Sequence, residues 1–201
     1  MGIQTTILRS VDATGGGHYR LGKTVAGLTT IAANGPVASF RWINTALRVL
    51  VHRITWGWFL STAFGSAQTV DHGIYKATGF TGSDTSGSTG VVTPKKTADI
   101  GQFLPVLGTD FDFRVGTLAA GTRTLNADFF AARGAWGGAI GAGIMNPPAD
   151  ITLDIEHEAN MVLGPGEGLV LNNLTVMGAT GVLQLYFEIA FSLQLPANIS
   201  V

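Results

Sequence analysis

Hydrophobic and polar residues alternate along the last fifth of the chain. Between Val182 and Leu195 every second position is apolar, at Leu183, Leu185, Phe187, Ile189, Phe191 and Leu193. Successive residues of a strand point to opposite faces of a sheet, so this alternation predicts a long strand with one apolar face. A second layer must cover that face, and the rest of the chain has to supply it.

A second apolar stretch lies just before this strand, over Gly168–Met177, and the four residues Gly178–Gly181 separate the two. Two strand patterns joined by a short loop bounded by glycines are typical of a β-hairpin. We therefore predict that the chain ends in a hairpin. A further strand is predicted over Ile151–Leu163, followed by a Gly- and Pro-rich turn.

The stretch Leu47–Leu60 is rich in β-branched and aromatic residues and predicts another long strand. Its apolar residues change phase: Leu47, Val49 and Val51 share one parity, and Leu50, Ile54, Trp56, Trp58 and Leu60 share the other. Either the strand is buried on both faces, or a bulge near Gly57 shifts the alternation.

Shorter alternating segments predict strands over Val37–Ile43, Gly73–Phe80 and Phe111–Leu118. We count about eight strands, few helix signals and no domain linker. The predicted fold is all-β, an antiparallel two-sheet sandwich that is jelly-roll-like and has long Gly-rich loops. Residues 36–201 form this single domain, and residues 1–35 form an N-terminal arm with at most a short strand.

The segment Ala131–Pro148 is apolar, yet it is dense in glycine, which disfavours both helix and strand. We interpret it as a long loop with four apolar contact points: Trp136, Ile140, Ile144 and Met145. An exposed apolar loop marks an interface. The alternative is a loop folded over the protein's own core.

Composition extends this picture to the surface. Only 12% of the residues are charged, against about 25% in a typical soluble domain, and the net charge is -1. Such a surface is expected where other subunits cover it. No basic patch, no basic start followed by an apolar stretch and no apolar run of about 18 residues occurs, so we predict no specific nucleic-acid partner, no signal peptide and no membrane partner.

The densest polar cluster is Asp154-Ile155-Glu156-His157-Glu158. On a strand, Asp154, Glu156 and Glu158 line one face at intervals of about 6.5 Å. Three carboxylates suit a calcium ion, but at this spacing the site would need ligands from elsewhere, so a solvated sheet face is the favoured interpretation. We place them with the interface residues and assign no metal site.

Catalytic motifs are missing from the sequence. Cysteine is absent, His18, His52 and His72 show no ligand spacing, and no nucleophile elbow or phosphate-binding loop occurs. We therefore expect no enzyme activity and no cofactor. A hydrolase or a lectin-like cupin is the competing hypothesis, and it requires a pocket of clustered His and carboxylate side chains.

Two other sets of side chains allow alternatives. Trp42, Trp56 and Trp58 form either a sugar-stacking platform or part of the core. The four arginines in predicted strands need partners if they are buried, and Glu188 or the acidic strand could supply them between subunits; these arginines are Arg41, Arg48, Arg53 and Arg114.

Several segments together resemble a family of small structural proteins from tailed bacteriophages, found among head genes. They are Phe40-Arg41-Trp42, Pro94–Thr97, Val115–Asn126 (VGTLAAGTRTLN) and Met161–Leu171 (MVLGPGEGLVL). The resemblance covers most of the chain from about residue 36 onward and is sharpest over Leu118–Leu125 and Leu163–Val170.

This resemblance implies a virion component made in the host cytoplasm and located on the capsid surface. The implied function is that of a capsid cement, or decoration, protein with a jelly-roll-like body. It would bind the major capsid protein and itself, as a homotrimer seated where capsomers meet. The alternative function is a receptor- or glycan-binding tail or fibre tip.

Overall fold

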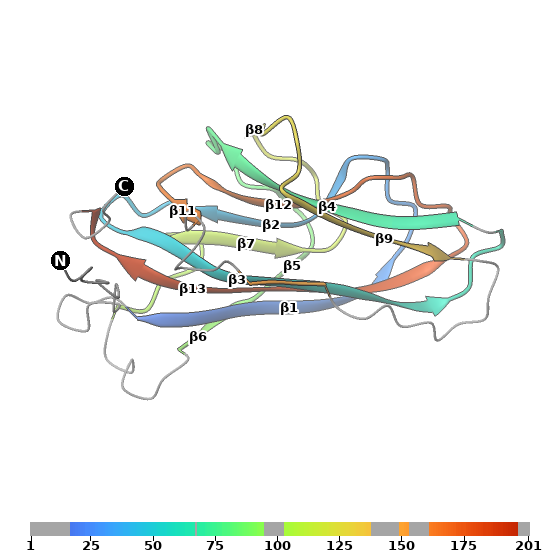
Figure 1. The fold of residues 1–201 in the computed structure, drawn as a ribbon, viewed down its shortest axis with the longest axis horizontal. Helices are drawn as coiled ribbons and strands as arrows, with labels where there is room; N and C mark the ends of the chain where they lie inside the picture. Colours follow the sequence, from blue (N-terminus) through green and yellow to red (C-terminus); the bar gives the residue numbers. More distant parts are fainter. Residues whose placement is uncertain (1–16, 67, 95–102, 138–148, 153–160, 197–201) are drawn as a thin grey trace, which may run out of the picture.

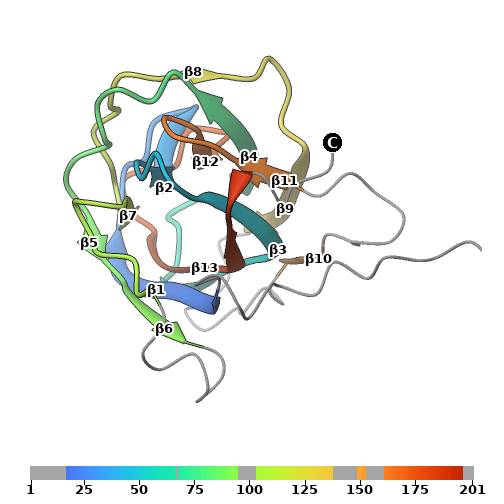
Figure 2. The same cartoon turned by 90° about the vertical axis from the view of Figure 1, so that its left-hand side faces the viewer.

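Two antiparallel β-sheets packed face to face make up the protein (Figures 1 and 2). The structure is a computed structural model and describes residues 17–66, 68–94, 103–137, 149–152 and 161–196. The predicted all-β, two-sheet antiparallel sandwich is confirmed. The described residues contain thirteen strands rather than about eight, because several have only two to four residues.

Sheet A has the strand order β10-β3-β13-β1-β6, and β11 also pairs with β3. Its strands are β10 (Ala149–Thr152), β3 (Arg48–Thr62), β13 (Val182–Gln194), β1 (His18–Leu28), β6 (Val91–Pro94) and β11 (Met161–Leu163). Strand β13 is therefore interior, with β1 on one side and β3 on the other.

Sheet B has the strand order β5-β7-β2-β12-β4-β8, and β9 also pairs with β4. Its strands are β5 (Ser88–Thr89), β7 (Phe111–Val115), β2 (Gly35–Trp42), β12 (Gly168–Asn173), β4 (Gln68–Thr78), β8 (Thr124–Leu125) and β9 (Ala131–Gly137). Figure 2 shows β5 and β6 along one lateral edge of the sandwich and β9 and β10 along the other.

The inner faces of the two sheets form one hydrophobic core. The alternation predicted for β13 is confirmed, since all six of its apolar positions from Leu183 to Leu193 are buried in this core. Aromatic rings pack across the sheets, for example Phe113 against Phe187 and Phe40 against Phe191. Burial of apolar surface between the layers is thus the main stabilising contribution.

The predicted C-terminal hairpin is wrong. Strand β12 lies in sheet B between β2 and β4, whereas β13 lies in sheet A. The residues between Asn173 and Val182 therefore cross from one layer to the other. Alternation shows that a strand has a buried face, but it does not identify the strand's hydrogen-bonding partner.

Part of the predicted N-terminal arm is an interior strand. Strand β1 pairs with β13 over most of its length and with β6 on its other side. Tyr19 and Leu21 are fully buried in the core. Polar, outward-facing residues between these apolar ones made the segment resemble an arm in the sequence. Residues 1–16 lie outside the described residues.

The phase change within β3 comes from a bulge at His52, not near Gly57. Ala190 of β13 pairs with Arg53 and Phe191 pairs with Val51, so His52 is an extra residue on β3. Val49 and Val51 face the core before the bulge, and Ile54 and the alternate residues after it face the core too. The extra residue lets the apolar side chains on both sides of the bulge face the core, although their sequence parity changes there.

Two other segments differ from their predictions. Residues 131–137 of the predicted glycine-rich loop form β9, paired with β4 from Gln68 to Ile74; glycine keeps the backbone donor and acceptor that a sheet ladder needs. Of the predicted strand Ile151–Leu163, the described residues lie in β10 and β11, with Thr152 opposite Arg53 and Met161 opposite Val51. Residues 138–148 and 153–160 lie outside the described residues.

His72 is a buried histidine at the end of the core. It is 1% exposed and packs edge-on against the Trp58 ring, with centroids 5.2 Å apart. Burial lowers the pKa of His72 from 6.5 to about 4, and the nearby Asp71 carboxylate raises it only in part. The ring is therefore neutral in the folded protein at neutral pH.

The first prediction concerns β1. Leu21→Ala should lower the free energy of unfolding by about 2–5 kcal/mol, because it leaves a cavity in the core. The control is Thr24→Ala at an exposed position of the same strand, expected to change stability by less than about 0.5 kcal/mol. Urea denaturation measures both, and equal small effects would show that residues 18–28 behave as an arm.

The second prediction concerns pH. Below about pH 6.5 the unfolded chain takes up a proton at His72, and the folded chain does so only near pH 4. Stability should therefore fall as pH falls between these values, by roughly 3 kcal/mol from this group. Urea denaturation from pH 8 downward should show a shallower pH dependence in His72→Leu than in the wild type; identical slopes would contradict the assignment.

Candidate binding surfaces

The outer face of sheet A carries a carboxylate held between two arginines. Glu188 accepts a hydrogen bond from Arg20 Nε at 2.6 Å and one from Arg53 at 3.2 Å. Glu188 is only 4% exposed, whereas the arginine side chains are 58% and 39% exposed. The guanidinium groups thus cover the carboxylate, and the cluster carries a net positive charge.

Strand order explains how three distant residues meet. Arg20 on β1 and Arg53 on β3 both lie opposite Ala190 of β13, one on each side. Glu188 is two residues along β13 and points to the same outer face. The small side chain of Ala190 leaves room for both guanidinium groups to reach the Glu188 carboxylate. Sequence separations of 168 and 135 residues hide this cluster from any spacing argument.

A second polar contact lies beside the cluster, at the bulge of β3. His52 Nε2 and Ser192 Oγ are 2.8 Å apart, and the His18 ring stacks on His52 with centroids 5.5 Å apart. Two of the histidines that are far apart in the sequence, His18 and His52, are therefore in contact. Ser192 is completely buried, so its hydroxyl is not available to a substrate. The pair holds the bulge in place rather than forming a nucleophile.

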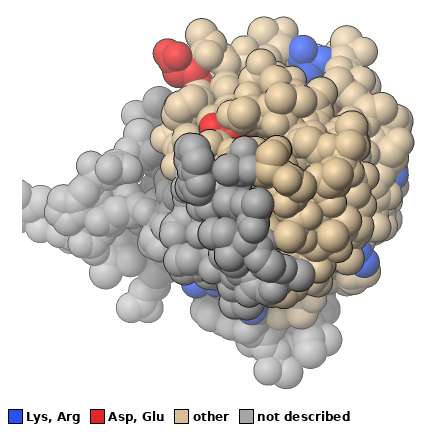
Figure 3. All heavy atoms as spheres, turned by 90° about the vertical axis from the view of Figure 1, so that its right-hand side faces the viewer, with Lys and Arg blue, Asp and Glu red and all other residues tan. Residues whose placement is uncertain are grey.

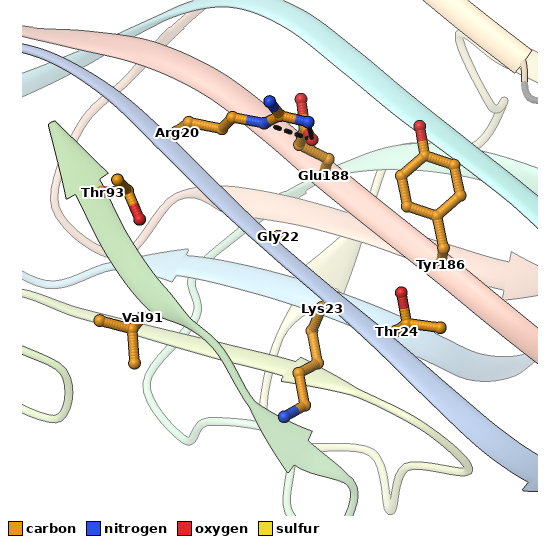
Figure 4. Close-up of a pocket in the computed structure, with 8 residues that line it drawn as sticks. All are labelled: Arg20, Gly22, Lys23, Thr24, Val91, Thr93, Tyr186 and Glu188. Atoms are coloured by element: carbon orange, nitrogen blue, oxygen red, sulfur yellow. Dashed lines mark hydrogen bonds and ion pairs between the residues drawn. The ribbon is translucent and has the colours of Figure 1, made fainter. Parts of the chain in front are cut away.

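An open groove of about 590 Å³ runs over β6, β1 and β13 on this face (Figure 4). Gly22 lies opposite Glu188, and its missing side chain leaves the floor open next to the Glu188 methylene carbons. Its lining combines two cations, one carboxylate and several hydroxyl groups: Arg20, Lys23, Glu188, Thr24, Thr93 and Tyr186, with Gly22 and Val91.

Exposed apolar side chains gather beside this groove. We call them the β6 edge surface, which consists of Val91, Phe103, Leu104, Val106 and Leu107; their exposed fractions lie between 38% and 81%. A cavity of about 150 Å³ lies between β6 and the segment from Leu104 to Leu107, next to Phe111. The Tyr19 hydroxyl donates to the Phe103 carbonyl oxygen and ties this segment to β1.

Outside the core, a buried ion pair lies over the outer face of sheet B. Arg123 and Asp84 contact each other with side chains 5% and 0% exposed, and Gly121 N–H donates to Asp84 at 2.6 Å. The Arg123 guanidinium lies over the Phe80 ring at 5.3 Å. Burial lowers the pKa of Arg123. This arrangement fixes loops on the outer face of the sheet.

The region around this ion pair also joins two segments that are far apart in the sequence, Leu118–Leu125 and Leu163–Val170. Arg123 and Leu125 belong to Leu118–Leu125, and Val170, which packs with Ala77 and Phe80, ends Leu163–Val170. Phe80 N–H donates to the Gly166 carbonyl at 2.8 Å. Leu118–Leu125 and Leu163–Val170 therefore both contact the buried Phe80 region.

The predicted interface residues fall mostly where the structure gives no description. Trp136 lies in β9, with its backbone opposite Thr69. The remaining six lie outside the described residues; they are Ile140, Ile144, Met145, Asp154, Glu156 and Glu158. The structure thus leaves these interface predictions untested.

Sequence alternatives for the tryptophans and arginines are resolved. Trp42, Trp56 and Trp58 are buried in the core and form no exposed platform. Arg53 pairs with Glu188 within one chain, not between subunits. The other three also find partners within the chain: Arg41 with Ser83, Arg48 with backbone carbonyls, and Arg114 with Asp112.

Comparisons with known proteins find no matching family model, curated protein or solved structure. Within the described residues, no group of three His, Cys, Asp or Glu side chains is placed to hold a metal ion. The same residues include no helix long and apolar enough to cross a membrane.

The third prediction tests the carboxylate on sheet A. Glu188→Gln should lower the free energy of unfolding by about 1.5–3 kcal/mol, because two arginines lose a charged acceptor and then repel each other. Glu167→Gln is the matched control, since the Glu167 side chain is 30% exposed against 5% for Glu188, and its pair with Lys76 is expected to contribute less than about 1 kcal/mol. Urea denaturation of both variants decides; an equal loss would contradict a special role for Glu188.

Proposed function

We propose that this chain is a non-enzymatic virion structural protein, a capsid cement protein that binds the major capsid protein and itself. The observation that carries the proposal is the β6 edge surface, where five apolar side chains remain exposed at one corner of the sandwich. Contiguous exposed apolar side chains mark protein interfaces. A jelly-roll-like body, a homotrimer and a place on the capsid surface belong to the same proposal.

The distribution of charge also supports it. Among the acidic residues whose side chains the structure describes, four are buried, namely Asp84, Asp110, Asp112 and Glu188. The end of the sandwich in Figure 3 is largely uncharged where its residues are described. A surface this poor in charge is suited to lasting contact with neighbouring subunits.

The mechanism of a cement protein is additive and needs no chemistry. Each copy would bury apolar surface against the shell and against other copies, at about 25 cal/mol per Å² removed from water. Repetition over a closed shell turns modest contacts into strong retention, because each bound copy holds the next at high effective concentration. No catalytic residue, metal or cofactor enters this mechanism.

A receptor- or glycan-binding tail or fibre tip is the second candidate. The groove over Gly22 favours it, because Tyr186 lies there among hydroxyl groups and cations that can bind a sugar (Figure 4). Burial of Trp42, Trp56 and Trp58 in the core speaks against it. We therefore rank the cement protein first.

The fourth prediction separates the two candidates by copy number. Quantitative mass spectrometry of purified particles should find on the order of hundreds of copies per particle for a cement protein. A few tens of copies or fewer would support the tail or fibre tip instead. If the chain is absent from assembled particles, both candidates are wrong.

A further inference from the structure

The sandwich carries a second exposed surface over β4 on the outer face of sheet B, on the side of that sheet away from β5. We call it the β4 edge surface, which consists of Asp71, Asp128, Phe129, Phe130 and Val176. The two phenylalanines are 44% and 39% exposed, and Val176 is 61% exposed. These residues come from β4, from the segment between β8 and β9, and from the segment that follows β12.

Described contacts bring Asp71, Phe129 and Val176 together over β4, and Asp128 and Phe130 adjoin Phe129 in the chain. Gly73 of β4 has no side chain, and Phe129 and Leu174 occupy the space above it. Atoms of both residues lie within 3.2 Å of the position that a Cβ atom would take at Gly73. Phe129 also packs edge-on against Tyr75, with centroids 5.9 Å apart. Thr175 N–H donates to the Asp71 carboxylate at 2.9 Å, which places Val176 next to it.

The two surfaces are complementary in charge. The β6 edge surface shares Val91 with the groove that contains Arg20 and Lys23, so its apolar side chains are flanked by cations. The acids near it are buried: Glu188 lies between two arginines, and Asp110 accepts from Val106 N–H and Asn44. The β4 edge surface instead combines apolar side chains with the carboxylates of Asp71 and Asp128.

We propose that copies of this chain bind one another head to tail, the β6 edge surface of one copy against the β4 edge surface of the next. This deepens the proposed function, on which it rests for its biological meaning, by naming the surfaces through which the protein binds itself. Because β6 and β4 lie in different sheets and on different sides of the sandwich, each bound copy keeps one free surface of each kind (Figure 2). Such a heterologous contact continues until a ring closes.

Apolar burial gives the contact its strength, and opposite charges orient it. Two β6 edge surfaces facing each other would bring cations together, and two β4 edge surfaces would bring carboxylates together. Each like-with-like pairing is therefore disfavoured, so the charges select the head-to-tail arrangement over a two-fold symmetric dimer.

The fifth prediction uses one variant of each surface, Val91→Asp and Val176→Asp. Sedimentation velocity over a wide range of protein concentration should show self-association of the wild type. Each variant alone should be monomeric, with its dissociation constant raised at least about tenfold. Thr62→Asp, an exposed position on neither surface, is the control and should associate as the wild type does. Circular dichroism melts check that every variant folds.

Mixing the two variants is the decisive step. A one-to-one mixture should form a heterodimer and nothing larger, because each partner brings one intact surface. Failure of the mixture to associate, or loss of association in only one variant, would overturn the head-to-tail arrangement. A wild type that stays monomeric at every concentration would also overturn it and leave both surfaces to another partner.

This experiment is independent of the particle measurement. A purified chain that associates head to tail, yet is absent from particles, would reject the proposed function and keep the inference. A chain found in many copies on particles, but monomeric when purified, would do the reverse.

Discussion

Apolar contact between the inner faces of the two sheets is the interaction on which the rest of the structure depends. It requires every long strand to keep its apolar side chains directed inward, and β3 keeps this direction only because of the extra residue at His52. The same bulge turns His52 and Arg53 outward, where they meet Ser192 and Glu188. The polar cluster on sheet A is thus a consequence of keeping the core in phase.

The alternation of apolar and polar residues predicted which faces of the long strands are buried. The alternation in β13 correctly identified its buried face, and the mixed parity of β3 correctly offered a bulge as one explanation. The hairpin failed because partner choice is set by which strands close the core, and β12 and β13 complete different sheets. Strand β9 was missed because its glycines weaken side-chain packing while its backbone still pairs with β4.

The candidate surfaces were less predictable than the fold, for a related reason. Arg20, Arg53 and Glu188 come from three strands that are neighbours only after the sheet has formed, and Asp84 meets Arg123 between two loops. A sequence shows which residues are charged but not which charges neutralise each other. Likewise, Leu125 and Val170 are 45 residues apart in the chain and pack in one cluster with Phe80 only in the folded protein.

The low content of charged residues must be interpreted together with the positions of those charges in the structure. Buried acids hold the protein's own arginines, as Glu188 and Asp84 do, so these charges act within the molecule and contribute little to solvation. Among the side chains that the structure describes, Arg20 and Lys23 line the groove with Val91, and Asp71 and Asp128 belong to the β4 edge surface with Val176. A protein under selection only for solubility would spread such charges over its surface. Their separation by sign, next to exposed Val91 and Val176, would fix the orientation of the proposed head-to-tail contact between copies.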